Sequence, residues 1–318
     1  MSIFYIKHLT KYNYSNFVID GANQIMLYPI EDASQKIKSQ KIKVSLNPKI
    51  ETHRDFFNNR VGSFMIIEPH NYLSISSEIE VETFEQIFPE DTVEAKSQWR
   101  TLESLKHQTE FIDFLKYKTF DGTPDILKLI QNKNVSVISP FKIVLEFCEY
   151  IYKNFNYIQG ITRVDSKLDE VWKLKAGVCQ DFTNILLQMV RMLGIPARYV
   201  SGYICPSDSK TRGEGATHAW IEAYIPFYGW LGIDPTNNSI ASQYHVKLAT
   251  GRDYKDCTPV KGVFKGHAKE ELFVKVKVST IKGGNETLNF PFNKAHKVGG
   301  NSYRKNQELI QQMQQQQQ

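Results

Sequence analysis

The stretch KAGVCQDF (residues 175–182) places a cysteine immediately before a strong helical pattern. A glycine at the C′ position (Gly194) and a following proline (Pro196) predict where this helix ends. Cys179 is therefore expected at the N-terminus of a buried amphipathic helix, directly after the flexible Gly177. The helix is indicated by apolar residues at three- and four-residue steps, namely Phe182, Ile185, Leu186, Met189, Val190 and Leu193.

The start of a helix is a favourable place for thiol chemistry. The thiolate is the nucleophilic form of cysteine, and the positive end of a helix stabilises an anion. The same unpaired N–H groups can hold the oxyanion that forms during acyl transfer. Taken alone, however, a cysteine in this position is more often a small residue that fills a tight contact between helix and sheet.

A predicted hairpin downstream supplies partners for this thiol. The segment THAWIEAYI (217–225) alternates as a strand, PFYG (226–229) turns, and WLGID (230–234) returns. His218 begins the first strand and Asp234 ends the second, so antiparallel pairing brings them together. Each alone is more often structural. Together with Cys179 they predict a Cys–His–Asp arrangement in which Asp234 fixes the tautomer of His218.

The length of 318 residues favours two domains, because a single core rarely grows beyond about 250–300 residues. Short alternating strands over 1–90 predict an N-terminal all-β sandwich, and 91–135 reads as a helical connector. Residues 136–280 form the expected α+β core, in which the cysteine-bearing helix packs on an antiparallel sheet and a final alternating strand follows. The glutamine-rich segment 281–318 is expected to be a flexible tail.

Composition excludes several classes of protein. A hydrophobic fraction of 41% excludes a mainly disordered chain, and a net charge of +5 gives little support to nucleic-acid binding. No apolar run approaches the ~20 residues that cross a bilayer. The four cysteines form no CxxC pair, which argues against a zinc site or disulfide framework. Without a signal-peptide pattern, free thiols point to the cytoplasm.

Several strings, in this order, resemble the transglutaminase-like superfamily, whose core is a papain-like thiol enzyme. Residues 5–18 also resemble the start of the β-rich domain that precedes this core in bacterial members described as cysteine proteases. The matching strings are YIKHLTKYNYSNFV (5–18), GVCQDF (177–182), LGIPARYVSGY (193–203), THAWIEAYIP (217–226), GWLGIDPTNN (229–238) and GRDYKDCTPVKG (251–262).

The resemblance implies a papain-like, transglutaminase-like α+β core and assigns roles to individual residues. Cys179 matches the nucleophile, His218 the general base and acid, and Asp234 the orienting carboxylate. The backbone N–H of Cys179 is the expected oxyanion donor, and Tyr157 is the candidate for a second donor or cleft residue. Animal members need calcium, but no D-x-D-x-D-G loop occurs here. No metal or cofactor is therefore expected.

The implied function is thiol-dependent acyl transfer on amide bonds. A cysteine peptidase or amidase acting on a peptide or protein substrate is favoured. Two alternatives stay open, namely a transglutaminase-type protein cross-linker and a non-catalytic peptide-binding module on the same scaffold. Neither a nucleic-acid nor a membrane partner is expected, and the sequence does not indicate an oligomeric state.

Overall fold

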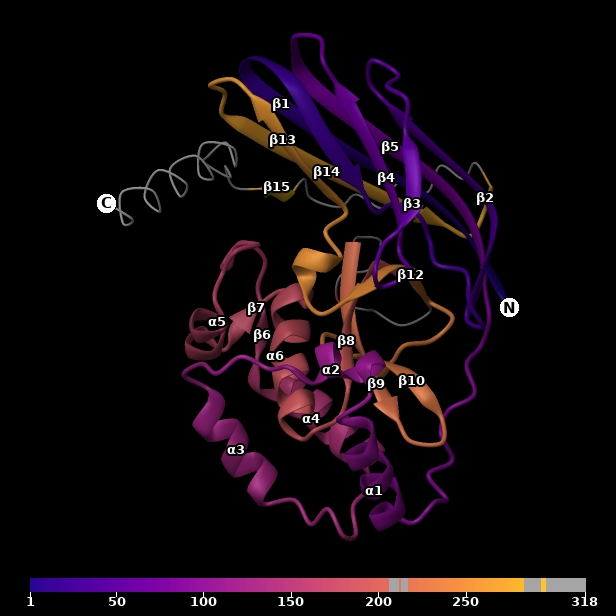
Figure 1. Ribbon diagram of the computed structural model, residues 1–318, viewed down its shortest axis with the longest axis vertical. Coiled ribbons are helices and arrows are strands. Elements are labelled where there is room, and N and C mark those ends of the chain that lie inside the picture. Colours follow the sequence, from indigo (N-terminus) through magenta and orange to yellow (C-terminus); the bar gives the residue numbers. More distant parts are fainter. Residues whose placement is uncertain (206–211, 213–216, 283–292, 296–318) are drawn as a thin grey trace. The chain divides into compact units, whose positions relative to one another are not determined.

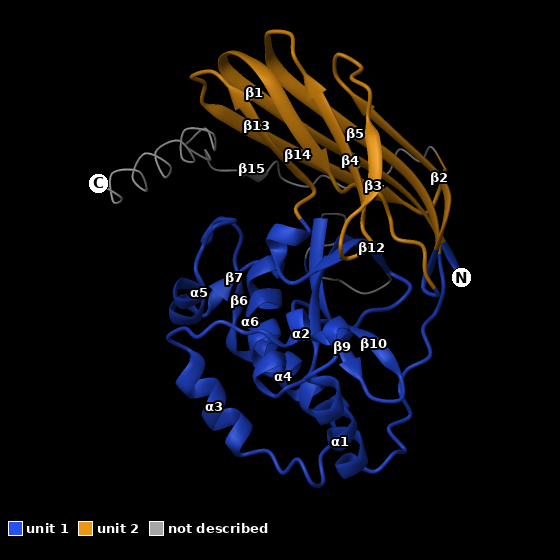
Figure 2. Cartoon of the chain, in the orientation of Figure 1, with its two compact units in different colours: residues 1–2, 33–35, 83–257 blue, residues 3–32, 36–82, 258–318 orange. Residues whose placement is uncertain are grey.

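The computed structural model describes residues 1–205, 212, 217–282 and 293–295. Figure 2 shows that the chain divides into two compact units. Unit 1 is formed mainly by Thr83–Cys257, together with Met1–Ser2 and Ala33–Gln35. Unit 2 combines Ile3–Asp32 and Lys36–Glu82 with the chain from Thr258 onward. The catalytic candidates all lie in unit 1, whose main segment is continuous in sequence.

Unit 2 is built from strands, as the alternating N-terminal sequence predicts (Figure 1). The long strand β1 joins its parts, because residues 5–14 pair with β14 whereas residues 19–25 pair with β4 and β13. β5 pairs with both β1 and β2. The strands are β1 (Ser2–Ile25), β2 (Gln35–Val44), β3 (Glu51–Arg54), β4 (Arg60–Ile66), β5 (His70–Thr83), β13 (Val260–Lys265), β14 (Glu270–Ser279) and β15 (Asn293–Ala295).

The alternating strand that we expected to complete the catalytic core, β14, lies instead in the N-terminal β unit. It pairs with β1 in antiparallel register, and its Val276 and Val278 are buried there. Alternation reveals that one face of a strand is buried, but not which sheet buries it. β15 pairs with β14, and the rest of the glutamine-rich tail lies outside the described residues.

Unit 1 combines six α-helices of the described chain with a five-stranded antiparallel sheet in the order β11-β10-β9-β8-β12. Three of the helices occupy the stretch 91–135, and α6 packs against β8, β9 and α4. Within the described part of the chain, no helix combines the length and apolarity needed to cross a bilayer. The helices are α1 (Ala95–Leu105), α2 (Thr109–Leu115), α3 (Thr123–Gln131), α4 (Pro140–Asn154), α5 (Leu168–Leu174) and α6 (Cys179–Met192).

The strands of unit 1 form this five-stranded sheet and one further pair, and most of their residues are buried. β6 and β7 form a separate parallel pair, next to the start of α6. The strands are β6 (Asn156–Tyr157), β7 (Ala176–Gly177), β8 (Ala197–Ile204), β9 (Thr217–Ile225), β10 (Gly229–Asp234), β11 (Ser239–Ile240) and β12 (His245–Gly251).

The predicted apolar stripe of α6 is buried from Phe182 through Val190, whereas its last member, Leu193, is half-buried as the residue that caps the helix. Gly194 follows the helix with a φ of +80°, a left-handed conformation that glycine adopts without strain. Near the C-terminal end, the guanidinium of Arg191 donates to the carbonyls of Ala197 (2.8 Å) and Arg252 (2.6 Å). These bonds fix the end of α6 to the sheet, so the helix presents its N-terminus in a defined position.

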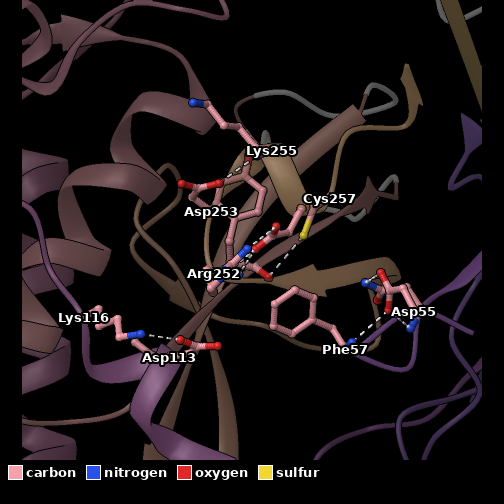
Figure 3. Close-up of polar contacts among 12 residues, drawn as sticks. Asp55, Phe57, Asp113, Lys116, Arg252, Asp253, Lys255 and Cys257 are labelled. Atoms are coloured by element: carbon pink, nitrogen blue, oxygen red, sulfur yellow. Dashed lines mark hydrogen bonds and ion pairs between the residues drawn. The ribbon is translucent and has the colours of Figure 1, made fainter. Parts of the chain in front are cut away.

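A short turn after β12 forms the last part of unit 1 (Figure 3). Arg252 binds the Asp256 carboxylate through two nitrogens, at 2.8 and 3.1 Å. Asp253 caps the 3-10 helix Tyr254–Asp256 by accepting the Lys255 N–H at 3.0 Å. The turn brings the ring of Tyr254 to within 6.2 Å of the buried ring of Tyr199 in β8, which extends the core beneath the sheet.

Candidate active site

Cys179 is the first residue of α6, and its surroundings explain the local sequence. The buried carboxylate of Asp181 accepts the Val178 N–H at 2.9 Å and the Thr162 hydroxyl at 2.6 Å. A Cβ at Gly177 would come within 2.5 Å of that carboxylate, so glycine is required there. Cys179 itself is half-buried, which leaves its thiol accessible next to the first N–H groups of the helix.

The β9–β10 hairpin brings His218 and Asp234 together, as its sequence predicts. Ile221 pairs with Ile233, so Asp234 lies diagonally across from His218 on neighbouring strands. The Nε2 of His218 lies 2.8 Å from Oδ2 of Asp234, and both side chains are fully buried. This geometry leaves Nδ1 as the free nitrogen of the imidazole.

The electrostatics of the pair favour a charged imidazole. Burial alone would lower the pKa of His218, but the Asp234 carboxylate and the Cys179 thiol raise it to about 10. Burial likewise opposes ionisation of Asp234, yet His218 and His245 hold the pKa of that carboxyl well below its usual range. His218 Nδ1 is buried and has no other hydrogen-bond partner among the described residues. At neutral pH the arrangement therefore supports an imidazolium that faces the Cys179 sulfur.

Asp234 accepts more hydrogen bonds than the hairpin alone predicts. The Thr236 N–H donates to Oδ1 at 2.9 Å, and the Asn237 amide donates to Oδ2 at 2.8 Å. A second histidine, His245 at the start of β12, places Nε2 3.2 Å from the same Oδ2. Sequence reasoning missed His245 because a lone histidine at the start of a strand carries no signal of what it contacts.

The two histidines and Asp234 also meet the spacing of a metal site. Their ligand atoms lie within 4.8 Å of one another, and all three residues are buried. However, Nε2 of each histidine already lies within hydrogen-bond distance of Asp234 Oδ2, which the Asn237 amide also contacts. A buried carboxylate that accepts this many hydrogen bonds needs no cation to balance it, so we interpret the cluster as a hydrogen-bonded network.

Tyr157, the candidate second oxyanion donor, lies beside the strand that leads to Cys179. Tyr157 pairs with Gly177 in the parallel β6–β7 ladder, and the next N–H, of Ile158, donates to the Gly177 carbonyl at 2.9 Å. Burial and the charge of Cys179 raise the pKa of Tyr157 to about 12. Its hydroxyl therefore keeps its proton at neutral pH, and the Gln159 side chain interacts with it.

The other three cysteines occupy different environments. Cys148, Cys205 and Cys257 are free thiols buried to 1% exposure or less. Burial raises the pKa of Cys148 and that of Cys205, which disfavours their thiolates. The Cys148 sulfur donates to the backbone carbonyl of Asp234 at 3.4 Å. This contact and its burial argue against a nucleophilic role for Cys148.

This contrast predicts selective alkylation. At about pH 6, iodoacetamide should modify Cys179 at least about tenfold faster than any buried cysteine, because Cys179 is half-buried at the start of α6 whereas the other three thiols are shielded from the reagent and burial disfavours a thiolate. Peptide mapping by mass spectrometry after timed quenching gives the four rates. Equal rates in folded protein would contradict an activated thiol at position 179.

Comparisons with known proteins agree with this architecture. The family model of the transglutaminase-like superfamily matches residues 130–235, and that of the bacterial transglutaminase-like N-terminal region matches residues 4–82. An uncharacterized protein of Mycobacterium leprae is 29% identical over 87% of this chain and 98% of its own length. The crystal structure of a "putative cysteine protease" from Cytophaga hutchinsonii superposes with a TM-score of 0.68 at 22% identity, covering 92% of this chain and 96% of that one.

A more distant match carries an enzyme name. The protein-glutamine gamma-glutamyltransferase of Pseudomonas aeruginosa is 24% identical over 49% of this chain, which corresponds to 22% of that protein.

Proposed function

We propose that this chain, which belongs to the transglutaminase-like superfamily, is a thiol-dependent acyl-transfer enzyme that cleaves amide bonds in peptides or proteins. The observation that carries the proposal is the buried His218–Asp234 pair, joined at 2.8 Å, together with the half-buried Cys179, which acts on the same imidazole. The match in fold to the Cytophaga protein supports a peptidase or amidase.

In the first half of the reaction, the Cys179 sulfur attacks the carbonyl carbon of the amide. The oxyanion that forms is stabilised by the backbone N–H of Cys179 at the start of α6, and by the Tyr157 hydroxyl. His218 then transfers its Nδ1 proton to the leaving amine, and the C–N bond breaks. The products of this half-reaction are a free amine and a thioester on Cys179.

In the second half, an acceptor attacks the thioester and His218 takes up its proton. Water as the acceptor completes hydrolysis and regenerates the thiol. Asp234 keeps His218 oriented through both halves and stabilises its positive charge. We propose that the enzyme works in the cytoplasm, because the four free cysteines suit a reducing compartment.

Transamidation is the second candidate, and the Pseudomonas gamma-glutamyltransferase relative favours it. In that reaction, a primary amine replaces water as the acceptor. The acylation chemistry at Cys179 is the same for both, so the two functions differ only in which nucleophile reaches the thioester.

One experiment separates these functions. Purified protein is incubated with a diverse peptide mixture that includes glutamine-containing members, with and without a primary alkylamine, and products are identified by mass spectrometry. We expect new N- and C-termini that are absent with Cys179→Ala protein. Amine-conjugated glutamine without new termini would replace hydrolysis by transamidation. Absence of any Cys179-dependent product would instead favour a non-catalytic binding module.

A further inference from the structure

The Asp234 carboxylate is shared among four groups, namely His218, Thr236, Asn237 and His245. Oδ2 alone accepts from His218 (2.8 Å), Asn237 (2.8 Å) and His245 (3.2 Å). A carboxylate oxygen offers about two lone-pair directions, so three donors compete for it. Each added donor withdraws negative charge that would otherwise stabilise the proton on His218.

The hydrogen bonds of His245 fix its tautomer. The Ser242 N–H donates to Nδ1 of His245 at 3.2 Å, so Nδ1 is the unprotonated nitrogen and Nε2 carries the hydrogen. That Nε2–H points at Asp234 and makes His245 a neutral donor. The ring is 8% exposed and packs edge-on against Trp220, with centroids 5.1 Å apart, which restricts its movement.

We propose that His245 is a positioning residue of the reaction, which shares Asp234 with His218 and limits how tightly Asp234 holds the proton on His218. The inference rests on the proposed function. The sharing of Asp234 matters most when the amine leaves, because His218 must then release its proton to the departing nitrogen. An imidazolium that is too stable would be a poor general acid at that step.

The groups that act on His218 come from several elements. Asp234 comes from β10, Cys179 from α6 and His245 from β12. Tyr157 of β6 interacts with both Cys179 and Asp234. His245 differs from the others in being a neutral N–H donor that acts on His218 through the shared carboxylate, and its ring also lies 6.1 Å from the ring of His218 between centroids. Its substitution changes no formal charge in the site.

Two matched variants of His245 test the contribution of its Nε2–H to the site. In His245→Gln, the side-chain amide reaches about as far as Nε2 and can still donate to Asp234. In His245→Asn, the side-chain oxygen can accept the Ser242 N–H, but the amide is too short to reach Asp234. Both substitutions are polar and smaller than histidine, so thermal melting should find similar stability.

The primary measurement is the rate of Cys179 carboxamidomethylation between about pH 6 and pH 11. The rate changes where His218 loses its proton. We expect this inflection to rise by about half a pH unit or more in His245→Asn and to stay at the wild-type position in His245→Gln. An unchanged inflection in folded His245→Asn, or equal shifts in both variants, would overturn the proposal.

Turnover provides the second measurement. His245→Asn should lower kcat for an amide by up to about threefold with little change in KM, because departure of an amine needs the proton and a half-unit shift in the acid changes that rate by no more. Acylation by a p-nitrophenyl ester should change less than about twofold, since its leaving group needs none. Equal losses on both substrates would indicate a merely structural role. If no amide is turned over but the alkylation inflection moves, the proposed function fails while the role of His245 stands.

Discussion

Replacement of Cys179 by alanine is expected to abolish acyl transfer, by a factor on the order of 10⁶, as removal of the nucleophile does in a serine triad. The sulfur forms the thioester through which the whole reaction passes, and no other thiol can replace it. Cys148 lies near Asp234 but is buried and donates to its backbone carbonyl. The measurement is the rate of formation of the products identified with wild-type protein.

The matched control is Cys205→Ala, which removes a fully buried thiol directly after β8 and outside the site. We expect that variant to lose some stability and to keep its activity per folded molecule. Because Cys179 is half-buried, Cys179→Ala should melt within a few degrees of wild type. Residual turnover above the uncatalysed rate in Cys179→Ala would remove the thiol from the mechanism.

Asp234→Asn is expected to lower turnover by roughly 10–10³-fold, less than the loss of Cys179. An equivalent change in a serine triad costs about 10⁴, but a thiol ionises more readily than a hydroxyl. The reason lies in the geometry: both oxygens of Asp234 accept hydrogen bonds, from Thr236 on one side and from His218 on the other. An amide presents N–H groups on one side, so one buried donor loses its partner.

The same substitution should cost about 1–3 kcal/mol in the free energy of unfolding. Its pH dependence has a definite sign. The pKa of Asp234 in the folded protein lies well below its ordinary value, so its stabilisation is present above that ordinary value and is lost as the pH falls further. Urea titrations from about pH 7 to pH 2 should therefore show a shallower acid decline in Asp234→Asn than in wild type.

Glu222→Gln is the matched control for a buried carboxylate. Glu222 lies on β9, as His218 does, and pairs with Arg198 at 2.6 Å and with Lys247 at 3.0 Å. Those cations hold its pKa down against burial. We expect comparable destabilisation with turnover per folded molecule preserved. Equal losses of turnover in the two variants would assign Asp234 a structural role only.

The sequence predicted the parts of the site whose positions depend on local patterns. Helical periodicity after Cys179 and strict alternation around His218 were sufficient to place both, and a two-strand hairpin determined the neighbour of His218. The helix and the hairpin can be placed from their local sequence, because the residues that pair within each of them are close together in the chain. Alternation likewise predicted the strands of the N-terminal region, although it did not predict that β1 pairs with the distant β13 and β14.

Contacts that depend on distant pairing were not predictable in this way. His245 reaches Asp234 although β9 and β8 lie between their strands in the sheet order, so no local pattern links the two residues. The prediction that β14 belongs to the catalytic core was wrong for the same reason, since its partner β1 lies more than 250 residues earlier in the chain. In both cases the pattern showed a buried face without revealing its partner.

The pairing of β1 with β13 and β14 also has a consequence for biosynthesis. A ribosome delivers β1 before the continuous segment Thr83–Cys257, and β13 and β14 after it. That segment can fold while the chain is still growing, whereas the parts of β1 that pair with β13 and β14 keep an open edge until those late partners are made. Exposed strand edges recruit other strands, so ribosome stalling or proteolytic loss beyond Cys257 would leave nascent chains prone to aggregate through β1.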